Sequence, residues 1–168
     1  REFHMYPELS FQEERTSKRV REELDKMQIP YITIEPNIIV ATINGGEKGK
    51  TLAIRADMDA LPMEELADIP FKSKNIGVMH ACGHDAHTAI LLGTAAALNE
   101  VKNQLKGKVK LCFQVAEEVG GGAMETLEHL KITEGVDEVI ALHVWAGIKS
   151  GYISVEPGGR MAGGQGWR

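Results

Sequence analysis

The spacing of hydrophobic and polar residues changes along this chain, and the changes predict the order of its elements. Short β-branched and apolar runs have the length of strands, whereas alanine- and leucine-rich segments carry apolar residues at helical spacing. The predicted strands are Asn37–Ile43, Thr51–Arg55, Lys108–Val115, Glu138–Val144 (expected to be buried) and Tyr152–Val155. The predicted helices are a stretch from Ser10 to about Met27, Thr88–Leu105 and Gly122–Leu130. Strands that alternate with helices predict an α/β fold, a layered sheet with helices on its faces.

Two local signals refine this picture. Ser10 and Glu13 have the spacing of a capping box, which predicts the start of an amphipathic surface helix. The glycine-rich segment 44–50 between two strands predicts a hairpin. This segment resembles a phosphate-binding loop, but Asn44 occupies the place of the outer glycine and the Gly-Lys-Thr run opens a strand instead of a helix. Nucleotide binding is therefore not expected.

Composition narrows the function classes. The chain has 168 residues, of which 43% are hydrophobic, which suits one domain with a core. Its net charge of −5 argues against a nucleic-acid partner. No apolar run approaches the roughly 20 residues of a membrane helix, and the first residues resemble no export signal, so no membrane partner and a cytoplasmic location are expected. Cys82 and Cys112 form no disulfide framework, which leaves Cys82 available as a metal ligand or a nucleophile.

Both ends of the sequence suggest a piece of a longer protein. The chain begins at Arg1, without a methionine, and enters a predicted helix almost at once. It closes on the glycine-rich segment Gly163–Arg168, which has no periodic pattern. We expect a fragment or an interrupted reading frame.

Side chains suited to metal chemistry follow three predicted strands. Thr51–Arg55 leads to Asp57 and Asp59, and Lys108–Val115 leads to Glu117 and Glu118. The strand part Glu138–Leu142 leads to His143. In open α/β sheets the carboxyl ends of the strands form the crevice in which ligands bind. A further group precedes the long helix and comprises His80, Cys82, His84, Asp85 and His87. Cys82 and His84 are two residues apart, so in an extended segment they would point the same way. Thiolate, imidazole and carboxylate together favour Zn²⁺, Mn²⁺, Co²⁺ or Ni²⁺ over Ca²⁺ or Mg²⁺.

Each of these residues also has an interpretation without a metal. Cys82 alone would be a small buried hydrophobic residue and His143 alone a core histidine, but their neighbours favour ligation for both. For the acidic pairs the two interpretations are evenly balanced: Glu117 and Glu118 suit a helix N-terminus, and Asp57 and Asp59 suit a turn before Pro62. The roles of His80 and His87 are not decided by the pattern, and one role is to form hydrogen bonds with the metal ligands. The remaining candidates are assigned to the core (Cys112), the surface (His129) and packing (Trp145).

Four motifs together resemble the M20 peptidase family. They are Arg55-Ala56-Asp57-Met58-Asp59-Ala60-Leu61-Pro62, Met79-His80-Ala81-Cys82-Gly83-His84-Asp85-Ala86-His87, Phe113-Gln114-Val115-Ala116-Glu117-Glu118 and His143-Val144. The opening Phe3-His4-Met5-Tyr6-Pro7-Glu8-Leu9-Ser10 is similar to the start of one subgroup, the N-acyl-amino-acid amidohydrolases, hippurate hydrolases and indole-acetyl-amino-acid hydrolases. The likeness covers residues 1–162, which we interpret as a partial catalytic domain, and leaves 163–168 as a tail outside the family.

The resemblance implies a site and a fold. Cys82, His84, Glu118 and His143 would be metal ligands, Glu117 the general base, and Asp59 a residue that orients or supports the site. Family members hold two divalent ions, here Mn²⁺ or Zn²⁺ with Co²⁺ or Ni²⁺ as further options. They do so in a three-layer zinc-peptidase-like α/β domain, a mixed sheet flanked by helices. An inserted lid domain serves substrate binding and dimer contact in the family.

The chain departs from the family pattern in three ways. Val115 stands where the family usually has proline. The lid domain, which would follow Met161-Ala162, is absent, and so is the closing part of the catalytic domain with its last histidine ligand. The parent enzyme would be a homodimer through the missing lid, and this piece would have little or no activity by itself.

The function expected from the resemblance is hydrolysis of the amide bond of N-acyl amino acids by a metal-activated water. Three alternatives belong to other classes. A fragment that binds metal without catalysis is the first, and a hydrolase with Cys82 as nucleophile is the second. A thiol redox protein is the third, and it is disfavoured because the chain has no C-x-x-C pair.

Overall fold

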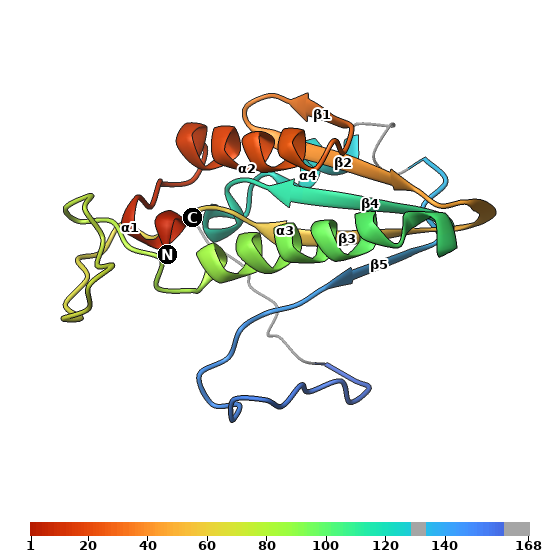
Figure 1. The fold of residues 1–168 in the computed structure, drawn as a ribbon. Coiled ribbons are helices and arrows are strands. Elements are labelled where there is room, and N and C mark those ends of the chain that lie inside the picture. Colours follow the sequence, from red (N-terminus) through yellow and green to blue (C-terminus); the bar gives the residue numbers. More distant parts are fainter. Residues whose placement is uncertain (129–133, 160–168) are drawn as a thin grey trace.

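The computed structural model describes residues 1–128 and 134–159, and these residues form a mixed sheet with helices on its faces (Figure 1). Its five strands lie in the order β1-β2-β4-β3-β5. The strands are β1 (Tyr31–Ile34), β2 (Ile38–Asn44), β3 (Glu47–Asp57), β4 (Lys106–Gln114) and β5 (Glu138–Ala141). The helices are α1 (Glu2–Met5), α2 (Glu14–Lys26), α3 (His84–Glu100) and α4 (Ala123–Glu128), with short 3-10 turns η1 (Lys102–Gln104) and η2 (Glu117–Val119). The α/β prediction is confirmed.

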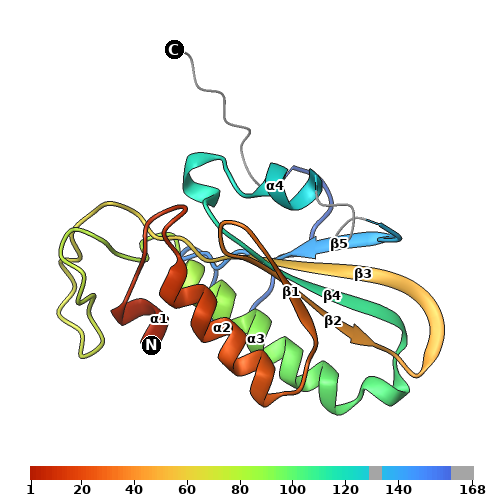
Figure 2. The same ribbon diagram turned by 90° about the horizontal axis from the view of Figure 1, so that it is seen from above.

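The directions of the strands explain how the helices form layers. β3 pairs in parallel with β4 on one side and with β5 on the other. Parallel neighbours need a crossover, and α3 lies in the connection from β3 to β4 while α4 lies in the connection from β4 to β5. These two crossovers run in opposite directions along the sheet, so right-handed connections place their helices on opposite faces. Figure 2 shows α2 and α3 on one side of the sheet and α4 on the other.

The predicted hairpin between β2 and β3 is wrong, because β4 lies between these two strands. β2 pairs with β4 in antiparallel fashion and does not pair with β3. The connecting glycines instead pass close to the start of β4, where Gly45 donates its N–H to Gly107 O over 2.8 Å. A Cβ atom on Gly45 or Gly46 would collide with the carbonyl oxygen of Leu105 or Asn103. The glycine-rich segment therefore permits a tight crossing of backbones. Its Gly-Lys-Thr run lies inside β3, as expected for a strand.

The predicted capping box of the first long helix is also wrong. Phe11 has a φ of 64°, which is incompatible with a right-handed helix, so α2 begins only at Glu14. The carboxylate of Glu8 accepts the first free N–H groups of α2, from Arg15 at 2.9 Å and Thr16 at 2.7 Å. Ser10 makes no cap and instead donates its hydroxyl to Asp59.

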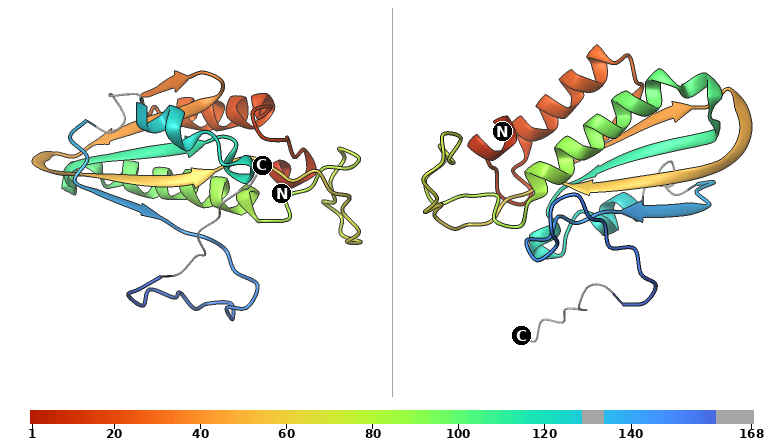
Figure 3. Two further views of the ribbon diagram at one scale, coloured as in Figure 1. Left: turned by 180° about the vertical axis from the view of Figure 1, so that it is seen from behind. Right: turned by 60° about the horizontal axis from the view of Figure 1, so that its bottom comes forward.

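The core lies between the sheet and the helices α2 and α3, which run side by side (Figure 3). Val20 and Leu24 of α2 are fully buried, as the amphipathic pattern predicted. They belong to one cluster with Leu91 of α3 and with Phe113 of β4. The cluster also contains Cys112, which confirms its assignment to the core. The elements that carry the polar clusters are thus packed on a common core.

Two strands predicted in the C-terminal part of the chain differ from the structure. β5 is a strand, but it ends at Ala141 and all four of its residues are exposed, so the expectation of a buried strand to Val144 is wrong. It lies at the edge of the sheet, where apolar composition does not ensure burial. Tyr152–Val155 form no strand, since residues 142–159 leave the sheet as a segment of loops and turns (Figure 1). His129, Leu130 and the tail 163–168 lie outside the described residues. Among the helices that are described, none has the length and apolar character to cross a membrane.

Candidate metal centre

The polar residues meet at the carboxyl ends of β3 and β4. Asp57 is the last residue of β3 and pairs with Gln114, the last residue of β4. From here the chain enters α3 on one face of the sheet and α4 on the other. Such a divergence of connections opens a crevice outside the strand ends, which is where ligands bind in α/β sheets. Glu117 and Glu118 lie in η2, directly after β4.

Cys82, His84 and His143 form one possible ligand group. Their donor atoms all lie within 4.8 Å of one another, and Sγ of Cys82 is 3.3 Å from Nε2 of His143. Cys82 and His84 are not in an extended segment as expected, because Gly83 between them has a φ of 92° and His84 is the first residue of α3. A Cβ atom on Gly83 would also collide with Val144. The close turn that brings the thiol and the imidazole together therefore depends on glycine.

His84, Glu117 and Glu118 form a second group, which shares His84 with the first. Nε2 of His84 lies 3.7 Å from Oε1 of Glu118 and 3.8 Å from Oε2 of Glu117. Both distances are too long for a hydrogen bond. Nε2 of His84 and Oε1 of Glu118 are buried and have no hydrogen-bond partner among the described residues. The side chain of Glu118 is 17% exposed and that of Glu117 is 42% exposed.

Asp59 contacts two members of this group, His84 and Glu118. Its Oδ1 lies 3.1 Å from Nδ1 of His84, and its Oδ2 accepts the Ser10 hydroxyl at 2.7 Å and the Glu118 N–H at 3.0 Å. Burial acts to raise the pKa of Asp59, but the hydrogen bonds from His84, Ser10 and Glu118 outweigh it and lower that pKa. An ionised Asp59 accepts a hydrogen bond from Nδ1–H of His84, so the neutral form of the ring, which a metal ligand requires, presents its Nε2 lone pair to the site.

Asp57 and His87 form a third group with His84, and hydrogen bonds within the protein already satisfy Asp57 and His87. Oδ1 of Asp57 lies 2.6 Å from Nδ1 of His87, and its Oδ2 is 2.8 Å from Nη1 of Arg55. Nε2 of His87 accepts the backbone N–H of Val144 at 3.0 Å. Burial opposes ionisation of Asp57, yet the contacts with His87 and Arg55 lower its pKa. The interpretation of Asp57 and Asp59 as turn formers is not borne out, since both side chains are buried in these contacts.

The donor set fits a divalent ion of the zinc type. Burial and the negative charge of Glu118 raise the pKa of the Cys82 thiol to about 11. Burial, together with the charges of Glu117 and Asp59, also raises the pKa of Glu118 despite the nearby His84. A cation among these groups would lower the pKa of both Cys82 and Glu118, because it stabilises their ionised forms. Donor atoms on one tetrahedral ion, with bonds of about 2.0–2.3 Å, stand roughly 3.3–3.8 Å apart. The distances between Cys82 and His143 and between His84 and Glu118 fall in this range.

The structure brings together the six residues to which the family resemblance assigns a role in the site. These are Cys82, His84, Glu117, Glu118, His143 and Asp59. The contact of Ser10 with Asp59 was not predicted, because the sequence pattern indicated a helix cap at Ser10. The pattern also assigned no definite role to His87. His80 is buried, and both of its ring nitrogens lack a partner among the described residues. Trp145 is 57% exposed and meets His143 edge-on, with ring centroids 5.9 Å apart.

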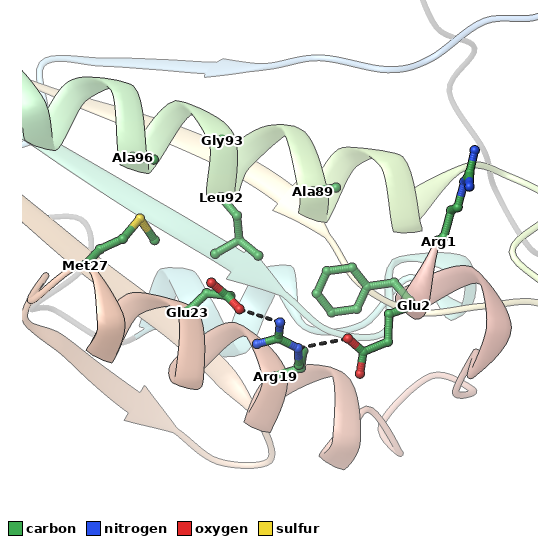
Figure 4. Close-up of a pocket in the computed structure, with 10 residues that line it drawn as sticks. Arg1, Glu2, Arg19, Glu23, Met27, Ala89, Leu92, Gly93 and Ala96 are labelled. Carbon is green, nitrogen blue, oxygen red and sulfur yellow. Dashed lines mark hydrogen bonds and ion pairs between the residues drawn. The ribbon is translucent and has the colours of Figure 1, made fainter.

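A pocket of about 360 Å³ lies elsewhere, between α1, α2 and α3 (Figure 4). Its floor is apolar and includes Leu92 and Met27, and its rim carries Arg19 between Glu2 and Glu23. None of the residues of the polar clusters lines it. The groups of described residues that could hold an ion lie at the carboxyl ends of β3 and β4 and not in this pocket.

Known proteins resemble the chain along most of its length. It is 44% identical to N-acetylcysteine deacetylase of Bacillus subtilis over 96% of the chain and 43% of that protein. It is 44% identical to the IAA-amino acid hydrolase ILR1-like 4 of Arabidopsis thaliana, over 97% of the chain and 37% of that protein. The chain thus spans less than half the length of these relatives. A crystal structure from Bacillus subtilis, described as a dinuclear metal binding peptidase from the M20 family, superposes with a TM-score of 0.81 at 45% identity. That match covers 84% of this chain and 40% of the other.

The expected M20-like α/β architecture is confirmed by this structural likeness. The sequence profile described as peptidase family M20/M25/M40 matches residues 53–158, which is more than half of the chain and includes both ligand groups. The chain therefore belongs to peptidase family M20/M25/M40.

Proposed function

We propose that this chain is the metal-binding part of a hydrolase that cleaves the amide bond of N-acyl amino acids. Relatives whose names state deacetylation of N-acetylcysteine or hydrolysis of amino acid conjugates support the substrate class. The observation that carries the proposal is the pair formed by Nε2 of His84 and Oε1 of Glu118. These two buried atoms lie 3.7 Å apart and have no hydrogen-bond partner among the described residues.

In this proposal Cys82, His84, Glu118 and His143 hold the metal, and two divalent ions occupy the site. Mn²⁺ and Zn²⁺ are the first candidates, followed by Co²⁺ and Ni²⁺, because all accept this mixture of donors. A bound divalent ion supplies Lewis acidity, which acidifies water and polarises a carbonyl group. Asp59 orients His84 through Nδ1 and holds the backbone of Glu118.

Glu117 is proposed as the general base. Its carboxylate lies beside the ligand group and is 42% exposed, so it can reach both solvent and substrate. Glu117 takes a proton from the attacking water as the water oxygen bonds to the acyl carbon. It then delivers that proton to the amine nitrogen as the carbon–nitrogen bond breaks. The products are a carboxylic acid and a free amino acid.

A metal-binding piece without catalysis is the second candidate. The chain spans 43% of a relative that it matches over nearly its whole length, and the strand that leads to His143 is exposed on the sheet edge. A lid domain and a closing segment, which the family resemblance implies for the parent enzyme, would complete the substrate pocket. The first proposal, the active amidohydrolase, also includes a homodimer of the parent enzyme through its lid domain and a cytoplasmic location.

A cysteine nucleophile has one observation in its favour, the 3.3 Å contact between Sγ of Cys82 and Nε2 of His143. A nucleophilic thiol needs a lowered pKa, however, whereas burial and nearby carboxylates raise that of Cys82. This alternative is therefore the weaker one.

Metal titration tests the proposal directly. Zn²⁺ and Mn²⁺ binding to the 168-residue chain would be measured by calorimetry for the wild type, Glu118→Gln and Asp68→Asn. Asp68 is exposed, so its substitution controls for the loss of one negative charge. We expect Glu118→Gln to weaken binding at least about tenfold and Asp68→Asn to leave it unchanged. Equal affinity of all three proteins would remove Glu118 from the ligand set.

Turnover is tested on the longest form of the protein that its gene encodes. A panel of N-acetyl, N-benzoyl and indole-acetyl amino acids would be assayed with and without metal. Hydrolysis that survives removal of the metal would refute the proposed mechanism, and hydrolysis by the 168-residue chain itself would refute the second candidate.

A further inference from the structure

Glu13 is a buried acidic residue outside the proposed ligand set. It is the N-cap residue of α2, and its side chain is fully buried. Its Oε1 accepts the backbone N–H of Ala116 at 2.8 Å, across 103 positions of sequence. Its Oε2 is buried and has no hydrogen-bond partner among the described residues. Burial of a carboxyl group costs free energy unless hydrogen bonds compensate for it, so the contact of Glu13 with Ala116 needs an explanation.

The partner of this contact is the residue that turns the chain into the site. Ala116 has φ 57° and ψ 34°, the left-handed conformation that residues with a Cβ rarely adopt. It lies directly before Glu117, and its backbone oxygen accepts the N–H of Gly121 at 2.8 Å. A left-handed residue at this point redirects the chain after β4 and so aims the next two side chains.

Two carboxylates from separate parts of the chain hold the turn, at amides two residues apart. Glu13 accepts the N–H of Ala116, and Asp59 accepts the N–H of Glu118 at 3.0 Å. Ala116 is itself fully buried, so its N–H has no access to water in place of Glu13. Glu13 has a rigid base, because the carboxylate of Glu8 caps the helix and Val20 and Leu24 anchor it in the core.

We propose that Glu13 is a positioning residue: by holding Ala116 in its left-handed conformation it fixes the turn that directs Glu117 and Glu118 toward His84. This inference rests on the proposed function, since it assigns a purpose to the orientation of the proposed base and ligand. The orientation of Glu117 and Glu118 would then be set from the start of α2, a helix that carries no proposed ligand.

Three substitutions test the role. Glu13→Met keeps the shape of the side chain and removes the acceptor. Glu13→Gln keeps an acceptor oxygen for Ala116, and Glu14→Met makes the same change at the exposed neighbouring position. Co²⁺ binding to the 168-residue chain, thermal unfolding without metal and hydrogen exchange at the Ala116 amide would be measured for each.

We expect Glu13→Met to weaken Co²⁺ binding at least tenfold and to speed exchange at Ala116 at least tenfold. Glu13→Gln should stay within threefold of the wild type in both, and Glu14→Met should match the wild type. A role in the core alone would lower the unfolding temperature of Glu13→Met but leave its Co²⁺ affinity within threefold, and that result would overturn the proposal.

Two further results keep the test decisive. If Glu13→Met does not fold, exchange in the wild type decides: protection of Ala116 supports the proposal, and exchange at the rate of an unstructured amide overturns it. Glu118→Ala separates this inference from the proposed function. Wild-type affinity in Glu118→Ala would refute the ligand assignment and this inference together, whereas weak binding there with normal binding in Glu13→Met would refute this inference alone.

Discussion

Val144 donates its backbone N–H to Nε2 of His87 over 3.0 Å, and the opposite nitrogen of the same ring lies 2.6 Å from Asp57. Because a backbone N–H can only donate, Nε2 must carry a lone pair and the ring proton must reside on Nδ1, facing the carboxylate. One neutral imidazole therefore connects the end of β3 to the segment after β5. His143 is the residue before Val144, so we expect this connection to help hold it beside Cys82.

Loss of the His87 ring should release that segment. β5 is exposed along its whole length, so few contacts besides this hydrogen bond hold its end near the site. We expect His87→Ala to weaken Zn²⁺ binding about 10- to 100-fold, the usual effect of removing a group that supports a ligand. Calorimetry would measure it, with Ile90→Ala on the exposed side of the same helix as the control. Unchanged affinity in His87→Ala would contradict the role.

Removal of the proposed base should separate catalysis from metal binding. In the longest encoded form of the protein, Glu117→Gln should lower kcat by a factor of about 100 or more while metal content stays near that of the wild type. The amide keeps the shape of the side chain but cannot take a proton. Steady-state kinetics and elemental analysis on the same samples would show it. Full activity in this variant would exclude Glu117 as the base.

Metal should protect one cysteine and have no effect on the other. Alkylation of Cys82 is expected to slow at least about tenfold when Zn²⁺ is added and to recover with a chelator, because a coordinated thiolate is shielded. Cys112, which is 6% exposed in β4, should stay unmodified in both states and serves as an internal control. Mass spectrometry after digestion would give both rates. An alkylation rate of Cys82 that does not change when Zn²⁺ is added would favour the alternative in which Cys82 is a nucleophile.

Glu13 should make the stability of the chain depend on pH. Burial raises the pKa of Glu13 from 4.5 to about 7, and the hydrogen bond from Ala116 only partly offsets this. The folded state then binds a proton that the unfolded state releases, so between pH 4.5 and 7 the free energy of unfolding falls as pH rises. Glu13→Gln should remove this loss and be more stable than the wild type by up to about 3 kcal/mol at pH 8, with little difference near pH 4.5.

Denaturant unfolding of both proteins at the two pH values would measure this effect, and the difference between them cancels the titration of all other groups. A constant difference between wild type and Glu13→Gln across this range would show that Glu13 ionises normally in the folded chain.

The local pattern predicted most helices and strands because burial on a sheet or helix face leaves a direct trace in residue spacing. It did not predict which strands pair. Gly45 and Gly46 suit a hairpin and equally suit a close crossing over the start of β4, and only the distant strand decides between them. The cap of α2 failed for a similar reason: the left-handed Phe11 delays the helix, and Glu8 replaces the predicted Ser10.

The candidate site was accessible from sequence because strand ends converge in an α/β sheet. That rule predicts that Asp57, Glu118 and His143 lie together at the carboxyl ends of the strands. It could not find Ser10 or Glu13, since both precede the sheet and reach the site through α2 and its approach. The boundary between residues 1–162 and the tail 163–168 remains a prediction, because the tail lies outside the described residues.

The insertion of β4 between β2 and β3 has a consequence for assembly. A chain that ends before residue 106 has both outer neighbours of β4 but not the strand that joins them. Until that strand arrives, β2 and β3 keep unsatisfied backbone edges, and a ribosome-bound intermediate of this length would be a good substrate for chaperones. The same strand leads directly to Glu117 and Glu118, so the strand that joins β2 to β3 also carries the acidic pair to the site.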